Sequence, residues 1–344
     1  MINKINTFGS YLLNGKFTKL LAFSLALIFS FNVGAQDAAE VPAVSGEVAY
    51  ILNTFLFLVC GFLVMFMAAG FCMLEAGQVR SKNTAVICLK NIGLFSIAGF
   101  MYYLVGYNLM YDGVDGGYIG SFSMFDRSSE VDLETGYAAA SDWYFQMVFV
   151  ATTASIVSGA LAERILIWPF FLFTAILTAF IYPIAGSWQW GGGWLSEMGF
   201  SDFAGSTLVH SVGGYAALAG AILLGARDGK YSADGKVNVI GGCSLPMTTL
   251  GVFILWLGWF GFNGGSQLAL GSGADATAVA DIFVNTNLAA AGGVLACMIV
   301  SKATNSHTNI AATLNGAIAG LVAITAEPLT PSMGQAVIIG AIGG

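Results

Sequence analysis

The chain has 344 residues, of which 57% are hydrophobic, only 9% are charged and 45 are glycine. So few charges over such a length exclude a soluble globular protein, and long apolar runs without alternation exclude a transmembrane β-barrel. The formal net charge is −7 and no basic patch is present, so nucleic acid is excluded as a partner. The composition predicts an all-α polytopic membrane protein with closely packed, glycine-rich helices.

Residues 1–35 are typical of a cleavable signal peptide. Lys4, Lys16 and Lys19 make a basic start, an apolar run covers Leu20–Phe31, and the small-residue sequence Val33-Gly-Ala35 follows. Cleavage after Ala35 would leave residues 36–344 as one transmembrane domain whose mature N-terminus lies outside the cytoplasmic membrane. The alternative is an uncleaved first transmembrane helix.

Eight apolar segments follow, each near the ~20 residues that span a bilayer. A ninth begins near Gly334 and reaches only Gly344, so we expect the bundle to be truncated within it. The eight segments are Val48–Leu74, Ala85–Met110, Trp143–Leu161, Ile165–Ile184, Ala204–Leu224, Leu245–Phe262, Ile282–Ser301 and Ile310–Thr325.

The positive charges indicate which connections lie in the cytoplasm. Beyond the signal peptide, eight of the nine Lys and Arg residues lie in or beside alternate connections, and Arg127 alone lies in the others. The cytoplasmic connections are then Gln78–Asn83, Glu163–Arg164, Ala226–Asn238 and Lys302–Asn309, and Tyr111–Asp142 and Gly186–Phe203 are external. Glu75 and Arg80, at the cytoplasmic end of the first span, either form an ion pair or reach the interface separately; we favour the second interpretation.

The stretch Asp202–Arg227 predicts one membrane-length helix, with Asp202 as its N-cap and Arg227 at its C-terminus. His210 would lie ~12 Å from the cap, near the middle of the bilayer. On a 3.6-residue period it shares a face with Ser206, Gly213, Ala217 and Gly220. We expect the imidazole to line a polar path; the alternative is a histidine hydrogen-bonded between packed helices.

Aromatic residues surround the expected position of this histidine. Trp188, Trp190 and Trp194 are all suited to the membrane interface, but only Trp190 precedes three glycines, which can hold its ring over an opening. Phe145 and Phe149 are one helical turn apart, and Phe262 lies four residues before Ser266. Each pair alone is a weak signal, whereas the combination with Trp190 and His210 indicates a cation path.

In these stretches the chain resembles the ammonium transporter family (Amt/Mep/Rh), over essentially the whole mature chain. The motifs that carry the resemblance are Asp202-Phe-Ala-Gly-Ser206 with His210, Gly213-Gly214 and Arg227; Gly159-Ala-Leu-Ala-Glu-Arg164; Trp190-Gly-Gly-Gly193; Gly258-Trp-Phe-Gly-Phe-Asn263 with Ser266; and Leu314-Asn-Gly-Ala-Ile-Ala-Gly-Leu321. The resemblance implies a bundle of about eleven helices built on an inverted repeat, here truncated after about eight spans plus part of a ninth.

The resemblance also implies a site and a function. NH4+ would bind at the Trp190 ring, the Phe149 ring and the Ser266 hydroxyl, with Phe145 a weaker candidate. It would lose a proton at a gate formed by Phe149 and Phe262, and NH3 would pass along a pore that includes His210. Asp202 would act structurally near this site.

Further expectations follow from the resemblance. The family's second pore histidine lies beyond residue 344, and we expect His307 to be merely solvated. The partners would be ammonium, the lipid bilayer, further copies in a homotrimer, and a cytoplasmic regulator of the PII class, for which Ala226–Asn238 is the candidate contact.

Two other functions fit parts of the sequence. One is an ammonium sensor, in which the same site drives a downstream signalling domain. The other is an intramembrane enzyme, for which His210 and Ser206 are the only base and nucleophile at suitable spacing; without a supporting motif we expect no enzyme. The five cysteines, in or beside apolar segments and without CxxC spacing, predict neither a metal site nor a disulfide framework, and we expect no cofactor.

Overall fold

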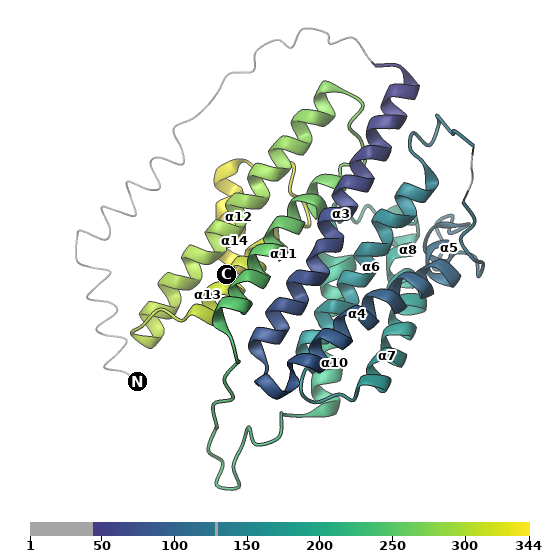
Figure 1. The fold of residues 1–344 in the computed structure, drawn as a ribbon. Helices are drawn as coiled ribbons and strands as arrows, with labels where there is room; N and C mark the ends of the chain where they lie inside the picture. The colour runs from purple at the N-terminus through teal and green to yellow at the C-terminus, as the bar shows by residue number, and fades with distance from the viewer. Residues whose placement is uncertain (1–43, 128–129) are drawn as a thin grey trace, which may run out of the picture.

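Helices make up most of the chain that the computed structural model describes, residues 44–127 and 130–344 (Figure 1). The predicted signal peptide, residues 1–35, lies outside the described residues. In chain order the helices are α3 (Gly46–Gln78), α4 (Thr84–Met101), α5 (Tyr107–Tyr111), α6 (Ala139–Leu161), α7 (Ile167–Ile176), α8 (Tyr182–Ser187), α9 (Trp194–Glu197), α10 (Val212–Leu224), α11 (Leu245–Gly265), α12 (Gly273–Asn305), α13 (Ile310–Ile324) and α14 (Met333–Gly343), with the short 3-10 helix η1 (Ser81–Asn83) before α4.

Three turns of π-helix join some of these helices into longer runs. They are η2 (Tyr102–Gly106), η3 (Leu177–Ile181) and η4 (Ser206–Ser211). Counting these runs, seven helices in the described residues are long and apolar enough to cross a membrane. The expected eighth span, α13, has 15 residues, and α14 has 11. The predicted all-α fold class is confirmed, although α13 is shorter than a typical span.

Close packing between α3 and α11 forms the centre of the bundle, with α6 on one side and α12, α13 and α14 on the other (Figure 1). The contact depends on glycine. A Cβ at Gly251 of α11 would lie 2.4 Å from the Leu74 backbone nitrogen and 2.7 Å from the Gly70 carbonyl oxygen of α3. Small residues of this kind are what allow helices to associate in a membrane, where lipid is as apolar as the side chains.

The connections meet in two groups, as the charge pattern predicts. At one end the Gly116 N–H donates to the Gly192 carbonyl, and the Phe203 N–H donates to the Ala326 carbonyl. At the other end the buried side chain of Glu163 forms ion pairs with Arg80 and Arg227, each at 3.0 Å. Three of the four connections expected in the cytoplasm therefore meet at one point.

The Glu163 carboxylate is fully satisfied at this point. It accepts hydrogen bonds from the backbone and guanidinium of Arg80, from the Asn83 amide and from Arg227. Burial favours its neutral form, but these hydrogen bonds outweigh that effect and lower the pKa of Glu163 from 4.5 to about 2.

The expectation for Glu75 was wrong in both of its forms, because Glu75 neither pairs with Arg80 nor reaches the interface. Arg80 pairs with Glu163, and Glu75, only 4% exposed, pairs with Lys90 of α4 at 3.2 Å. Lys90 itself is 3% exposed and donates to the Ser158 carbonyl at 2.7 Å. The carboxylate does not reach the interface because a buried cation on a neighbouring helix compensates its charge.

Candidate functional site

Trp190 lies in the connection between α8 and α9, and its ring is fixed from two sides. The indole nitrogen donates to the Asp202 carbonyl at 2.8 Å, and the ring meets Phe149 edge-on with centroids 6.0 Å apart. A Cβ at Gly205 would lie 2.9 Å from the Trp190 ring. Glycine at that position therefore allows the indole to approach the helix that carries His210.

Phe149 of α6 and Phe262 of α11 are stacked, with ring centroids 4.0 Å apart and an interplanar angle of 21°. Both side chains are at most 1% exposed. Phe145, one turn earlier on α6, lies 4.7 Å from Phe149 and stacks on Phe57 of α3 at 5.3 Å. The pair expected to form a gate is thus a closed apolar contact, and Phe145 lies behind it against α3.

Ser266 is the C-cap residue of α11, one turn beyond Phe262, and it is partly buried. Its hydroxyl donates to the Phe262 carbonyl at 2.8 Å. Since the proton is used there, the lone pairs of the oxygen remain free to accept. Among the described residues no hydrogen bond joins it to Trp190, and Phe262 and Phe149 connect the two expected binding groups.

His210 lies on the other side of the Phe262 ring. The imidazole meets Phe262 edge-on at 5.4 Å and stacks on Trp259 at 5.0 Å. Its Nδ1 is 2.9 Å from the Gly205 carbonyl oxygen. A carbonyl only accepts, so Nδ1 carries the proton, and in a neutral ring Nε2 is left with a lone pair.

Asp202 organises the start of this helix. Its buried carboxylate accepts the backbone N–H groups of Gly205 and Ser206, each at 3.0 Å, and those of Thr207 and Leu208, each at 2.8 Å. Burial raises the pKa of the Asp202 carboxyl above its ordinary 3.8, and the four donors act against that rise. The carboxylate thus satisfies four of the N–H groups that a helix start leaves free.

Two expectations about this helix need correction. It begins at Ser206, four residues after Asp202, whose carboxylate accepts the N–H groups of its first residues, so His210 is the fifth residue of the helix. The single face is also divided. His210 contacts α11, whereas Gly213 and Gly220 lie against Ile156 and Leu161 of α6. The cause is the π-helical turn η4, which shifts the 3.6-residue period on which the expectation relied.

The base and nucleophile considered for an enzyme do not meet. Ser206 donates its hydroxyl proton to the Val322 carbonyl at 2.9 Å, while His210 bonds to Gly205. His307 lies at the exposed end of α12, away from these residues, where its Nδ1 is 2.9 Å from the Asn305 carbonyl oxygen. Ser206 and His307 therefore do not extend the series of rings that runs from Trp190 to His210.

Trp259 also belongs to this group of rings, although the motif Gly258–Asn263 that contains it did not single it out as a site residue. This residue is 1% exposed, stacks on His210, and donates its indole N–H to the Thr325 hydroxyl at 2.7 Å. Its position three residues before Phe262 could have indicated this from the sequence, because residues at that spacing lie on the same side of a helix.

Comparisons with known proteins agree on one family. A model of the Ammonium Transporter Family matches residues 55–344. A putative ammonium transporter of Synechocystis is 43% identical over 92% of this chain and 72% of its own length. Ammonium transporter Amt2 of Archaeoglobus fulgidus is 44% identical over 90% of this chain and 66% of its own.

Solved structures show the same similarity. A chain described as a sensor Amt protein aligns with a TM-score of 0.81 and 38% identity, covering 87% of this chain and 74% of its own. Mep2 of Candida albicans aligns with a TM-score of 0.77 and 30% identity, covering 87% of this chain and 66% of its own. The chain therefore spans about two thirds to three quarters of the length of these relatives.

Proposed function

Because the chain belongs to the ammonium transporter family, we propose that it carries ammonium across the membrane, binding NH4+ at Trp190 and passing NH3 beside His210. The observation that supports this most directly is the continuous series of rings Trp190, Phe149, Phe262 and His210, with centroid distances of 6.0, 4.0 and 5.4 Å. The series runs from an external connection into the bundle.

The outer part of the series suits a cation with protons to donate. The faces of Trp190 and Phe149 attract positive charge, and the Ser266 oxygen retains lone pairs for an N–H donor. Potassium matches ammonium in charge but cannot donate to that hydroxyl. The site therefore favours NH4+ over K+.

The stacked pair Phe149 and Phe262 supplies the discrimination against charge. An ion loses its hydration in such an apolar contact, which costs several kcal/mol, whereas neutral NH3 passes when the rings separate. NH4+ therefore gives its proton to water on the outer side of the rings and passes as NH3. Beyond the rings, the lone pair on Nε2 of His210 accepts a hydrogen bond from NH3.

The test is the ammonium-pulse current and the NH3 flux of proteoliposomes that contain the full-length protein. Trp190→Ala removes the cation–π contact and should weaken ammonium binding roughly 2- to 30-fold. His210→Ala should abolish flux with little effect on binding. Trp188→Ala and His307→Ala are the matched controls, because Trp188 bonds to the Tyr118 carbonyl and His307 lies in an exposed connection. Flux that survives His210→Ala would refute the proposed path.

An ammonium sensor is the second candidate, favoured by the similarity to the sensor Amt protein at a TM-score of 0.81. It predicts tight binding of ammonium, lost in Trp190→Ala, without current or flux in the full-length protein. The same proteoliposomes therefore separate transport from sensing.

Orientation and assembly are part of the proposal. The end that carries Arg80, Arg164 and Arg227 faces the cytoplasm, since positive charge is retained on that side. The mature N-terminus is then outside, and Ala226–Asn238 is available to a PII-type regulator. A homotrimer is proposed from the family resemblance, and the mass of the purified detergent complex tests it.

A further inference from the structure

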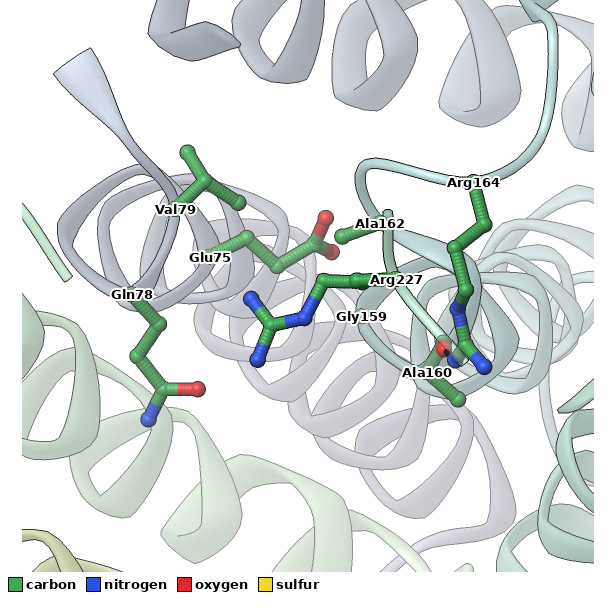
Figure 2. Close-up of a pocket in the computed structure, with 8 residues that line it drawn as sticks. All are labelled: Glu75, Gln78, Val79, Gly159, Ala160, Ala162, Arg164 and Arg227. Carbon is green, nitrogen blue, oxygen red and sulfur yellow. Dashed lines mark hydrogen bonds between the residues drawn. The ribbon is translucent and has the colours of Figure 1, made fainter. Parts of the chain in front are cut away.

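A cavity of about 140 Å³ lies where α3, α6 and α10 end, on the side opposite Trp190. A single water needs only about 10–15 Å³ of such space, so the cavity has room for a ligand of several heavy atoms. In Figure 2, Glu75 and Gln78 of α3 lie on one side, Ala162 and Arg164 lie on the other, and Arg227 lies between them. The lining residues are Glu75, Gln78, Val79, Gly159, Ala160, Ala162, Arg164 and Arg227.

Glu75 presents an unused acceptor to this cavity. Its Oε2 accepts from Lys90 at 3.2 Å and from the Ser158 hydroxyl at 2.9 Å. Its Oε1 has no hydrogen-bond partner among the described residues, although the side chain is only 4% exposed, and the Asn91 amide is the one further donor that acts on this carboxylate. A buried carboxylate oxygen without a donor is costly, so a ligand that brings an N–H group there is stabilised.

The two arginines present donors to the same cavity. Arg227 uses one nitrogen, Nη1, for the Glu163 carboxylate, at 3.0 Å. Arg164 uses its two terminal nitrogens for the Gly225 and Ala160 carbonyls, and its buried Nε has no partner in the described part of the chain. No ion pair joins Glu75 to either arginine in that part, because Glu75 pairs with Lys90 and Arg227 with Glu163.

A ligand that carries both charges matches the carboxylate and the guanidinium groups together, whereas a simple ion matches only one of them. A small cation at Glu75 would also face Lys90, Arg164 and Arg227, and a small anion at the arginines would face the Glu75 carboxylate. We propose that this cavity binds a small zwitterion of the α-amino acid class, with its ammonium on Oε1 of Glu75 and its carboxylate on the guanidinium groups. Charge-assisted hydrogen bonds at both ends of the ligand make the cavity selective for a molecule that carries an ammonium and a carboxylate.

The test uses the full-length protein purified in detergent, with radiolabelled glycine as the probe. Saturable binding is expected, and neither acetate nor methylammonium at the same concentration should displace the label, since each supplies one charge only. Trp190→Ala should leave glycine binding unchanged, so this site is tested separately from the proposed ammonium site. Absence of saturable binding, or displacement by acetate or methylammonium as effective as by glycine, would overturn the proposal.

Two variants locate the site. Glu75→Gln removes the charge and should weaken glycine binding about tenfold or more. Because that change leaves Lys90 buried without its counter-charge, Gly159→Val provides an independent test. A Cβ at Gly159 lies 3.7 Å from the Glu75 Cγ, an ordinary contact, so the variant should fold while its methyl groups occupy the cavity. Gly214→Val, where a Cβ meets nothing within 4 Å, is the control. Unchanged binding in Gly159→Val refutes the assignment.

Discussion

Replacing Asp202 by asparagine tests how the helix that carries His210 is held. The carboxylate accepts four backbone N–H groups, two on each oxygen, at 2.8 to 3.0 Å. Asparagine keeps one carbonyl oxygen and turns its NH2 group toward the other two N–H donors. Two of the four hydrogen bonds are then lost, and the two that remain go to a neutral oxygen instead of a charged one. The side-chain NH2 group also faces the two backbone N–H groups that have lost their acceptor.

The magnitude follows from burial. Asp202 is 1% exposed, so water cannot replace the lost bonds. A hydrogen bond to a charged group contributes about 1.5–3 kcal/mol, so the loss of two predicts a destabilisation of about 3 kcal/mol or more. For a chain of this size, the midpoint of thermal unfolding should fall by roughly 5 °C. Asp202→Asn should also weaken ammonium binding, because the Asp202 carbonyl holds Trp190.

The assay is thermal unfolding of the purified protein in detergent, together with ammonium binding. The matched control is Asp132→Asn, the same change at an exposed loop carboxylate that accepts the backbone N–H groups of Glu134 and Thr135. We expect a much smaller fall of the midpoint there, since solvent compensates exposed groups. An equal fall in both midpoints would refute the argument that these four buried bonds hold the helix start.

Two further predictions concern the bundle. Gly251→Ala places a Cβ 2.4 Å from a backbone nitrogen of α3 and should destabilise the folded protein by about 1–3 kcal/mol. The control is Gly214→Ala, whose Cβ meets nothing within 4 Å and should leave the midpoint of thermal unfolding unchanged. If the two midpoints fall equally, or neither falls, the prediction is wrong. The pKa of Glu163 is lowered from 4.5 to about 2, so its contribution to stability is present above about pH 4.5 and is lost as the pH falls toward 2. The unfolding midpoint of Glu163→Gln should therefore depend less on pH in that window than those of the wild type and the Glu134→Gln control, and parallel curves would count against it.

The spans and the grouping of their connections were predictable from sequence, because both depend on local composition. A segment of about 20 apolar residues must cross the bilayer, and positive charge is retained on one side. The meeting of Arg80, Glu163 and Arg227 at one end agrees with that grouping. The resemblance to the family supplied the candidate residues Trp190, Phe149, Phe262, Ser266 and His210.

The partners of those residues could not be predicted, because they come from helices that are distant in sequence. Lys90 was counted with the cytoplasmic charges, yet it lies buried against Glu75, since only the packing of α3, α4 and α6 brings the two together. The π-helical turn at Ser206–Ser211 also has no local signal in hydrophobic periodicity. It depends on the Asp202 carboxylate and on Gly205, whose φ of +95° a side chain would rarely adopt.

By itself, the sequence determined that this protein is a helical membrane protein and which segments are apolar enough to span, because these follow from composition, and its motifs determined the family that it resembles. Only the tertiary structure decided that Phe149 and Phe262 stack at 4.0 Å, that Trp259 lies beneath His210, and that Glu75 keeps one oxygen free in a cavity. Such contacts are set by how helices pack against one another, and glycines such as Gly251 determine how closely they approach.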